Sequence, residues 1–203
     1  MPHLPGKLKR TTRVFIVTGR FQPIHRGHVL FWKKIVHRFS CFLIVCVLRD
    51  ERHSNEKAVE ESENEYLVAS KWTHAPKNNP MPAFNRLQLV ALAIASDPVL
   101  RKAAIPMLRS RPDISWEASL RDLPTDRTWV FNLSKGHFDR TKPQFYRSKG
   151  ERVQVVQMGK FDYEGTKIRE QLSNGIRSFT FLPSGCETYF RCYCLSFFLE
   201  PAS

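Results

Sequence analysis

The stretch RVFIVTGRFQPIHRGH, residues 13–28, joins an apolar run to a loop that carries two glycines, two arginines and two histidines within residues 19–28. The apolar run predicts a buried strand over residues 13–18. Beyond the loop, apolar side chains recur at helical spacing and predict a helix over residues 27–39 that packs on a sheet. These elements form the first half of a strand–helix–strand unit.

The next segment completes this unit and indicates the fold class. Residues 41–48, CFLIVCVL, are almost all apolar, which is typical of an interior parallel strand buried on both faces. Similar patterns predict further strands over residues 103–108, 128–133 and 152–156, and helices over residues 83–96, 165–173 and 183–199. Strands that alternate with helices predict an α/β fold with a doubly wound, Rossmann-like parallel sheet.

We expect one domain over residues 13–203. The basic residues 1–12 predict a flexible N-terminal arm. Residues 49–66 are polar and acid-rich and predict a solvent-exposed excursion, and residues 111–126 predict irregular structure. The apolar tail, residues 183–199, fits either a last core helix or a contact between subunits, so homo-oligomer formation stays open.

The composition limits the partners and the location of the protein. The formal net charge of +13 over 203 residues favours anionic partners such as nucleotides, polyphosphates or nucleic acid. Five cysteines, an odd number, indicate reduced thiols and a cytoplasmic location. No run of about 18 apolar residues exists, and the first 13 residues have no apolar core. The sequence therefore predicts neither a membrane span nor a secretory signal.

The loop after the first strand has the residues of an anion site. His25 and His28 are three apart and project from one face of the helix N-terminus, where free N–H groups and the helix dipole favour an anion. Gly19 permits a sharp exit from the strand, Arg20 adds a guanidinium fork, and Gly27 leaves room for a base or sugar. Ligands of open α/β sheets bind at such strand ends. A histidine pair at this spacing also occurs as surface or packing residues.

A second segment near the C-terminus, YEGTKIREQLSNG, residues 163–175, has a complementary pattern. Thr166 is placed to cap a helix and to donate its hydroxyl to a phosphate. Arg169 is three residues farther on and shares the same helix face. Taken alone, this segment also fits a capped surface helix with solvated charges.

Together the two motifs resemble the nucleotidyltransferase superfamily with an H-x-G-H loop and a second loop of the S/T-x-x-x-R type. GRFQPIHRGH with GTKIR is similar to nicotinamide-nucleotide adenylyltransferases of the archaeal type, including those fused to a Nudix domain in bacteria. The resemblance extends more weakly over residues 13–190 and includes NPMPAFNR, residues 79–86. This chain has Glu164 and Lys167 where the family has serine and glutamate, and Asn78 where it has an arginine. No Nudix motif follows.

The resemblance implies adenylyl transfer: the 5′-phosphate of a mononucleotide attacks the α-phosphorus of ATP, and pyrophosphate leaves. A phosphate monoester is already an anionic nucleophile, so no general base is expected. By resemblance the catalytic residues are His25, His28 and Arg169, and the residues that bind ATP and its phosphates are Gly19, Arg20, Phe21, Gly27, Gly165, Thr166 and Ile168. Magnesium is expected to arrive with ATP and to keep mostly water ligands, so no protein metal site is predicted.

The acceptor side is less defined by the sequence. Lys77 and Arg86 are candidates for the acceptor phosphate. Trp116 or Trp129 is a candidate to stack on the nicotinamide cation. Each of the four also fits an ordinary role, since basic residues are often solvated and tryptophans often belong to the core.

Two other functions stay open at this stage. One keeps the nucleotidyl transfer but changes the acceptor or the base, as in phosphopantetheine adenylyltransferases or cytidylyltransferases. The other is a degenerate, non-catalytic member that binds nucleotide or RNA through its basic surface. RNA binding is disfavoured because aromatic residues do not alternate with basic residues on the predicted strands.

Overall fold

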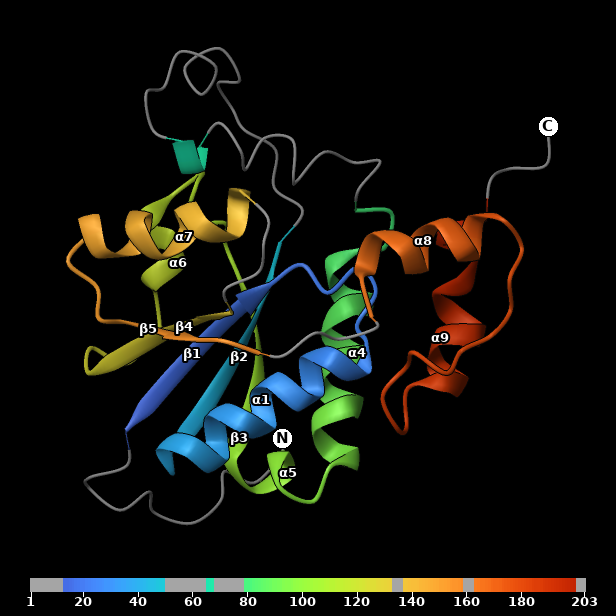
Figure 1. The fold of residues 1–203 in the computed structure, drawn as a ribbon, viewed down its shortest axis with the longest axis horizontal. Helices are drawn as coiled ribbons and strands as arrows, with labels where there is room; N and C mark the ends of the chain where they lie inside the picture. Colours follow the sequence, from blue (N-terminus) through green and yellow to red (C-terminus); the bar gives the residue numbers. More distant parts are fainter. Residues whose placement is uncertain (1–12, 50–64, 68–78, 133–136, 159–162, 200–203) are drawn as a thin grey trace.

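The computed structural model describes residues 13–49, 65–67, 79–132, 137–158 and 163–199. Its centre is a five-stranded sheet in the order β3-β2-β1-β4-β5, with every pairing parallel (Figure 1). The strands are β1 (Val14–Gly19), β2 (Phe42–Leu48), β3 (Ala104–Arg109), β4 (Arg127–Asn132) and β5 (Val153–Val156). This is the doubly wound α/β sheet that the sequence predicts.

Helices cover both faces of this sheet, as Figure 1 shows. On one side lie α1 (Arg26–Phe39), α4 (Ala83–Ser96), α5 (Leu100–Ala103), α8 (Gly165–Ser173) and α9 (Glu187–Tyr193), with a 3₁₀ turn η2 (Leu195–Phe198). On the other side lie α6 (Trp116–Leu120) and α7 (His137–Ser148). Strands with both faces covered read as continuous apolar runs, and β2 is buried at all seven positions.

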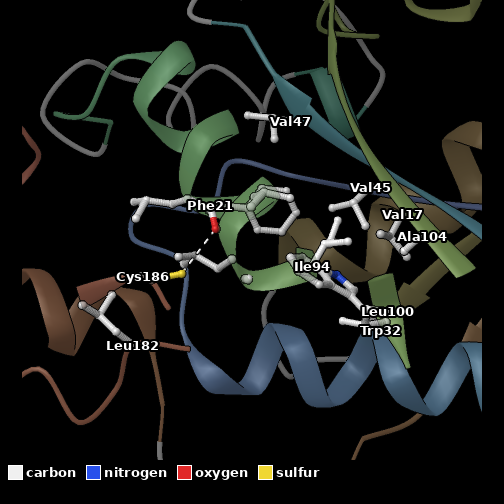
Figure 2. Close-up of a cluster of buried hydrophobic side chains, with 14 of the residues drawn as sticks. Val17, Phe21, Trp32, Val45, Val47, Ile94, Leu100, Ala104, Leu182 and Cys186 are labelled. Atoms are coloured by element: carbon white, nitrogen blue, oxygen red, sulfur yellow. Dashed lines mark hydrogen bonds between the residues drawn. The ribbon is translucent and has the colours of Figure 1, made fainter. Parts of the chain in front are cut away.

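Alternation along the strands divides the core into two clusters. The first contains Phe15, Val17 and Val45 and the inner faces of α1, α4, α8 and α9. Figure 2 shows Phe21 and Trp32 among its members. The second contains Ile16 and Ile44 with the rings of α6 and α7. Each strand thus sends successive side chains to opposite layers.

Three regions differ from the sequence-based expectations. Residues 111–126, expected to be irregular, contain α6, because the Ser115 hydroxyl accepts a hydrogen bond from the Ala118 N–H at 3.2 Å and caps the helix. Helix α7 was not predicted. The excursion over residues 49–66 lies mostly outside the described residues, and its far end is not exposed: Tyr66 is buried and stacks on Phe145 with ring centroids 4.3 Å apart.

The C-terminal tail belongs largely to the core. Phe190, Cys194 and Phe198 are buried in the first cluster. Before them, the backbone oxygen of Phe181 accepts a hydrogen bond from the Arg26 N–H at 2.8 Å, which ties this segment to the start of α1. The tail therefore supports the helix N-terminus that the sequence singles out. The N-terminal arm, residues 1–12, lies outside the described residues.

Candidate active site

The strand order places one crevice at the carboxyl ends of β1 and β4. The chain runs from β1 outward through β2 to β3 and then continues on the other side of β1 with β4 and β5. Ligands of open α/β sheets bind at such a reversal of strand order. A pocket of about 400 Å³ lies there, within the size range of small-molecule sites.

Nine of the residues predicted for catalysis or for ATP line this pocket: Gly19, Arg20, Phe21, His25, Gly27, His28, Gly165, Thr166 and Arg169. They come from the loop after β1 and from the beginnings of α1 and α8, segments about 140 residues apart in the sequence. The structure therefore brings the two motifs into one site. Two helix N-termini open toward the same pocket, and both favour anions.

The Phe21 ring packs tightly beneath the histidines of the first motif. Phe21 has a positive φ of 52° and is only 5% exposed. Its ring meets His28 edge-on, with centroids 5.0 Å apart, and Trp32 at 5.5 Å. An added Cβ on Gly19 would lie 2.8 Å from the Phe21 ring. Glycine at the end of β1 therefore makes room for the ring that supports His28.

His25 and His28 stack on one another with ring centroids 3.7 Å apart. The His25 backbone N–H donates to Nδ1 of His28 at 3.2 Å. A ring nitrogen that accepts a hydrogen bond is unprotonated, so neutral His28 carries its proton on Nε2. This tautomer offers an N–H donor rather than an acceptor to a ligand.

Burial keeps both imidazoles neutral in the absence of a ligand. It lowers the pKa of His25 from the ordinary value of 6.5 to about 4. Burial lowers the pKa of His28 well below 6.5, and the neighbouring His25 lowers it further. Desolvation disfavours the charged form of a histidine. At neutral pH the pair therefore presents two uncharged hydrogen-bond donors.

These pKa shifts predict a pH dependence of stability. Between the unfolded pKa near 6.5 and the folded value near 4, the unfolded chain binds more protons than the native protein. The free energy of unfolding should therefore fall as the pH drops through this range, by about 2 kcal/mol for His25 between pH 7 and pH 5. Urea unfolding at the two pH values measures the loss, and His25→Gln should reduce it. An identical pH dependence in wild type and variant would contradict the assignment.

The second motif is connected directly to the first. Arg169 donates from Nη1 to the backbone oxygen of Gln22 at 2.7 Å and from Nη2 to Thr166 Oγ1 at 3.1 Å. Gln22 is itself buried, and its side-chain amide makes two hydrogen bonds with the backbone of Met81. These contacts hold the guanidinium beside the histidine loop. Glu164 and Lys167 form an exposed ion pair at the start of α8, 3.3 Å apart.

Three residues predicted for the site do not line the pocket and pack in the core clusters instead: Trp116, Trp129 and Ile168. Trp116 meets Phe145 and Tyr146 edge-on in the second cluster. Trp129 is 3% exposed, and its Nε1–H donates to Glu151 Oε2 at 2.8 Å. Ile168 is buried in the first cluster, where its side chain packs among apolar residues. The side chains of these three residues therefore pack in the core and do not line the pocket, contrary to the prediction from the sequence.

Arg86, the remaining described candidate for the acceptor, is a structural residue. It is 1% exposed and donates to three backbone oxygens, those of Met81, Arg20 and Leu48, at 2.8–3.0 Å. It therefore joins the ends of β1 and β2 to the start of α4. Lys77 lies outside the described residues.

This role of Arg86 predicts an effect on stability. Arg86→Met removes the guanidinium donor from the Arg20 and Leu48 oxygens, while the Met81 oxygen keeps its hydrogen bond from the Gln22 side chain, so the free energy of unfolding should fall by about 2 kcal/mol. Arg101→Ala, which removes an exposed arginine from α5, should change it by less than about 0.5 kcal/mol. Denaturant unfolding measures both. A fully stable Arg86→Met variant with a raised KM for the acceptor would restore the role expected from the sequence.

Several lining residues were missed by the sequence reasoning. They are Thr18, Gln22, Asn132, Lys142, Met158 and Tyr163. Asn132 ends β4, and its side-chain oxygen accepts a hydrogen bond from the Met158 N–H at 3.1 Å. The strand-end position was a signal for Asn132, because the site lies at strand ends. Lys142 belongs to α7, and no local pattern pointed to it.

The described lining of the pocket contains no set of carboxylates that could cage a divalent cation. Its described lining residues include no aspartate or glutamate. Among the described residues, no cluster of three or more His, Cys, Asp or Glu side chains is placed to hold a metal ion. Magnesium prefers carboxylate, phosphate and water oxygens, so a cation that enters this site would be held by the phosphates of its ligand.

Within the described chain no helix is long and apolar enough to cross a membrane.

Comparison with known proteins finds similarity to nucleotidyltransferases. Residues 16–77 match the family model described as cytidylyltransferase-like. The chain is 24% identical over 197 residues to a probable nicotinate-nucleotide adenylyltransferase of Corynebacterium glutamicum, an alignment that covers 90% of this chain and 87% of that protein.

Solved structures with this fold include two proteins with bound nucleotides. One is a bifunctional NMN adenylyltransferase/ADP ribose pyrophosphatase of Francisella tularensis, solved with AMP and a manganese ion, with a TM-score of 0.56 and 12% identity. The other is TmcAL of Thermotoga maritima, bound to alpha-thio ATP, with a TM-score of 0.51 and 10% identity. Each covers 89% of this chain, which spans about half the length of either structure (48% and 55%). The comparisons confirm the resemblance to nucleotidyltransferases and the enzyme class expected from the sequence.

Proposed function

We propose that this protein transfers the adenylyl group of ATP to the 5′-phosphate of nicotinamide mononucleotide, forming NAD and pyrophosphate. The observation that carries the proposal is the convergence of the stacked His25–His28 pair and Arg169 on one pocket between two helix N-termini. Similarity to the C. glutamicum protein supports a pyridine mononucleotide as the acceptor. That protein's name makes nicotinic acid mononucleotide the alternative acceptor.

The donor substrate is ATP with its magnesium ion. In the proposed complex the histidine pair donates N–H bonds to the phosphates around the α-phosphorus. Arg169 and Thr166 hold the β- and γ-phosphates at the start of α8, and Arg20 adds a positive charge from the loop after β1. Such donors act by positioning and by stabilising charge that develops in the transition state.

The reaction balances without a general base. An oxygen of the acceptor phosphate forms a bond to the α-phosphorus, and the bond from that phosphorus to the bridging oxygen of pyrophosphate breaks. In the proposed complex Arg169 and the N-terminus of α8 stabilise the negative charge that moves onto pyrophosphate. Neutral imidazoles are suited to this task, since they donate hydrogen bonds without repelling a cation that accompanies ATP. We further propose a cytoplasmic location, where five free cysteines remain reduced.

A donor–acceptor matrix tests the proposal against its alternatives. Purified protein is given MgATP or MgCTP with nicotinamide mononucleotide, nicotinic acid mononucleotide or phosphopantetheine, and pyrophosphate release is measured. We expect turnover with ATP and a pyridine mononucleotide only. Turnover with CTP or phosphopantetheine would replace the proposed substrates, and no turnover in any combination would favour the degenerate, non-catalytic interpretation.

A further inference from the structure

Four near-parallel rings follow one another along the wall of the pocket. The His25 and His28 rings are 3.7 Å apart at 28°. Tyr163 lies 6.1 Å from His25 at 26°, and Trp32 lies 6.3 Å from His28 at 28°. Trp32 is one helical turn beyond His28 in α1, whereas Tyr163 comes from the other motif, just before α8 begins.

The two histidines are held by different means. The His28 ring is fixed through Nδ1, which accepts the His25 backbone N–H. Nδ1 of His25 is buried and makes no hydrogen bond of normal geometry among the described residues, although the side chain faces the His28 backbone N–H as in a capping box. Packing against the neighbouring rings of His28 and Tyr163 therefore contributes to fixing the orientation of the His25 ring. Parallel rings at these centroid distances attract one another.

Several charged side chains lie near His25, whose protonation depends on how far water reaches its ring. Arg20, Lys142 and Arg169 line the same pocket and give it positive charge. The carboxylate of Glu164 is exposed and pairs with Lys167. Burial lowers the pKa of His25 to about 4, so a group that keeps water from the ring also keeps it neutral.

We propose that Tyr163 is a positioning residue for the proposed adenylyl transfer, because its ring packs against His25 and fixes the imidazole as a desolvated N–H donor. The inference rests on the proposed function. The stack also links the two motifs, because Tyr163 lies just before α8, the helix that carries Thr166 and Arg169. The hydroxyl group is not required, because the contact is made by the ring.

Kinetics of three variants test this role. Tyr163→Ala should lower kcat by about 10- to 100-fold, the range expected when a catalytic group is misplaced by about 1 Å, while the KM of the mononucleotide changes little. Tyr163→Phe keeps the ring and should stay within about twofold of wild type. Tyr193→Ala removes a tyrosine of α9 that is 62% exposed and is the matched control.

A histidine titration followed by NMR separates positioning from a general loss of structure. In Tyr163→Ala the pKa of His25 should rise toward 6.5, while Tyr163→Phe should keep it near the wild-type value. This measurement requires no turnover, so it tests the ring contact even if the proposed reaction is wrong. Equal His25 pKa values in wild type and Tyr163→Ala, or loss of activity in Tyr163→Phe as large as in Tyr163→Ala, would overturn the proposal.

Discussion

His28→Ala should lower kcat for NAD formation by about 100- to 1,000-fold, the cost of removing one donor aimed at developing charge. The variant loses the Nε2–H of His28 and also the acceptor that holds the His25 backbone N–H. The stacked partner of the His25 ring disappears as well. Steady-state kinetics with saturating ATP and mononucleotide measure the effect.

His37→Ala is the matched control for this variant. His37 lies in the last turn of the same helix and is exposed. Its replacement should leave kcat within about twofold of wild type. The account is contradicted if folded His28→Ala protein, with the native circular dichroism spectrum, retains kcat within about threefold of wild type.

Arg169→Ala should have an effect of similar size, about 100- to 1,000-fold on kcat. The guanidinium lies between the two motifs, bonded to the Gln22 oxygen and to the Thr166 hydroxyl. Its loss removes positive charge where pyrophosphate develops and releases the start of α8 from the histidine loop. Arg169→Lys keeps the charge but not the fork, so it should recover only part of kcat. Stopped assays of NAD formation measure both variants.

Arg177→Ala provides the control of the same residue type. Arg177 lies just beyond the end of α8 and is exposed, and it donates to the Leu172 oxygen at 3.2 Å. We expect wild-type kcat from this variant. If Arg169→Ala and Arg177→Ala lost activity equally, the effect would come from the helix as a whole rather than from the guanidinium at the pocket.

The positions of the strands, and the parallel, doubly wound class of the sheet, could largely be predicted from the sequence, but the strand order was not predicted. Strands buried on both faces leave an almost continuous apolar run, as in β2, and helices that pack on one face leave apolar residues at helical spacing. The predicted helix over residues 83–96 coincides with α4. The expectation of one domain over residues 13–203 stays a prediction.

Helix α7 was missed for a physical reason. It carries many charged residues and contains Pro143 in its interior, and both features weigh against a helix when the sequence is considered alone. Burial of Phe145 and Tyr146 against β4 and β5 compensates in the folded protein. Tertiary packing of this kind cannot be deduced from local propensity.

Site residues that lie within a short motif could be predicted from the sequence. Residues that only the fold brings to the site could not. The motifs around His25 and Arg169 could be identified because histidine, glycine and arginine occur at helix starts after strands. Arg86 and Trp129 were also predicted as site residues. In the structure Arg86 donates to backbone oxygens, and Trp129 donates to Glu151. Nothing local distinguishes a buried arginine from a ligand-binding one, and nothing local indicated that Tyr163 would stack on His25.

The transfer of label from ATP tests the central claim most directly. Wild-type protein is incubated with magnesium, ATP labelled at the α-phosphorus and nicotinamide mononucleotide, beside His25→Ala protein of the same fold. The account predicts that the wild type alone places the label in NAD and releases unlabelled pyrophosphate. Absence of labelled dinucleotide from a wild-type sample that binds ATP, or equal labelling by the His25→Ala protein, would contradict it.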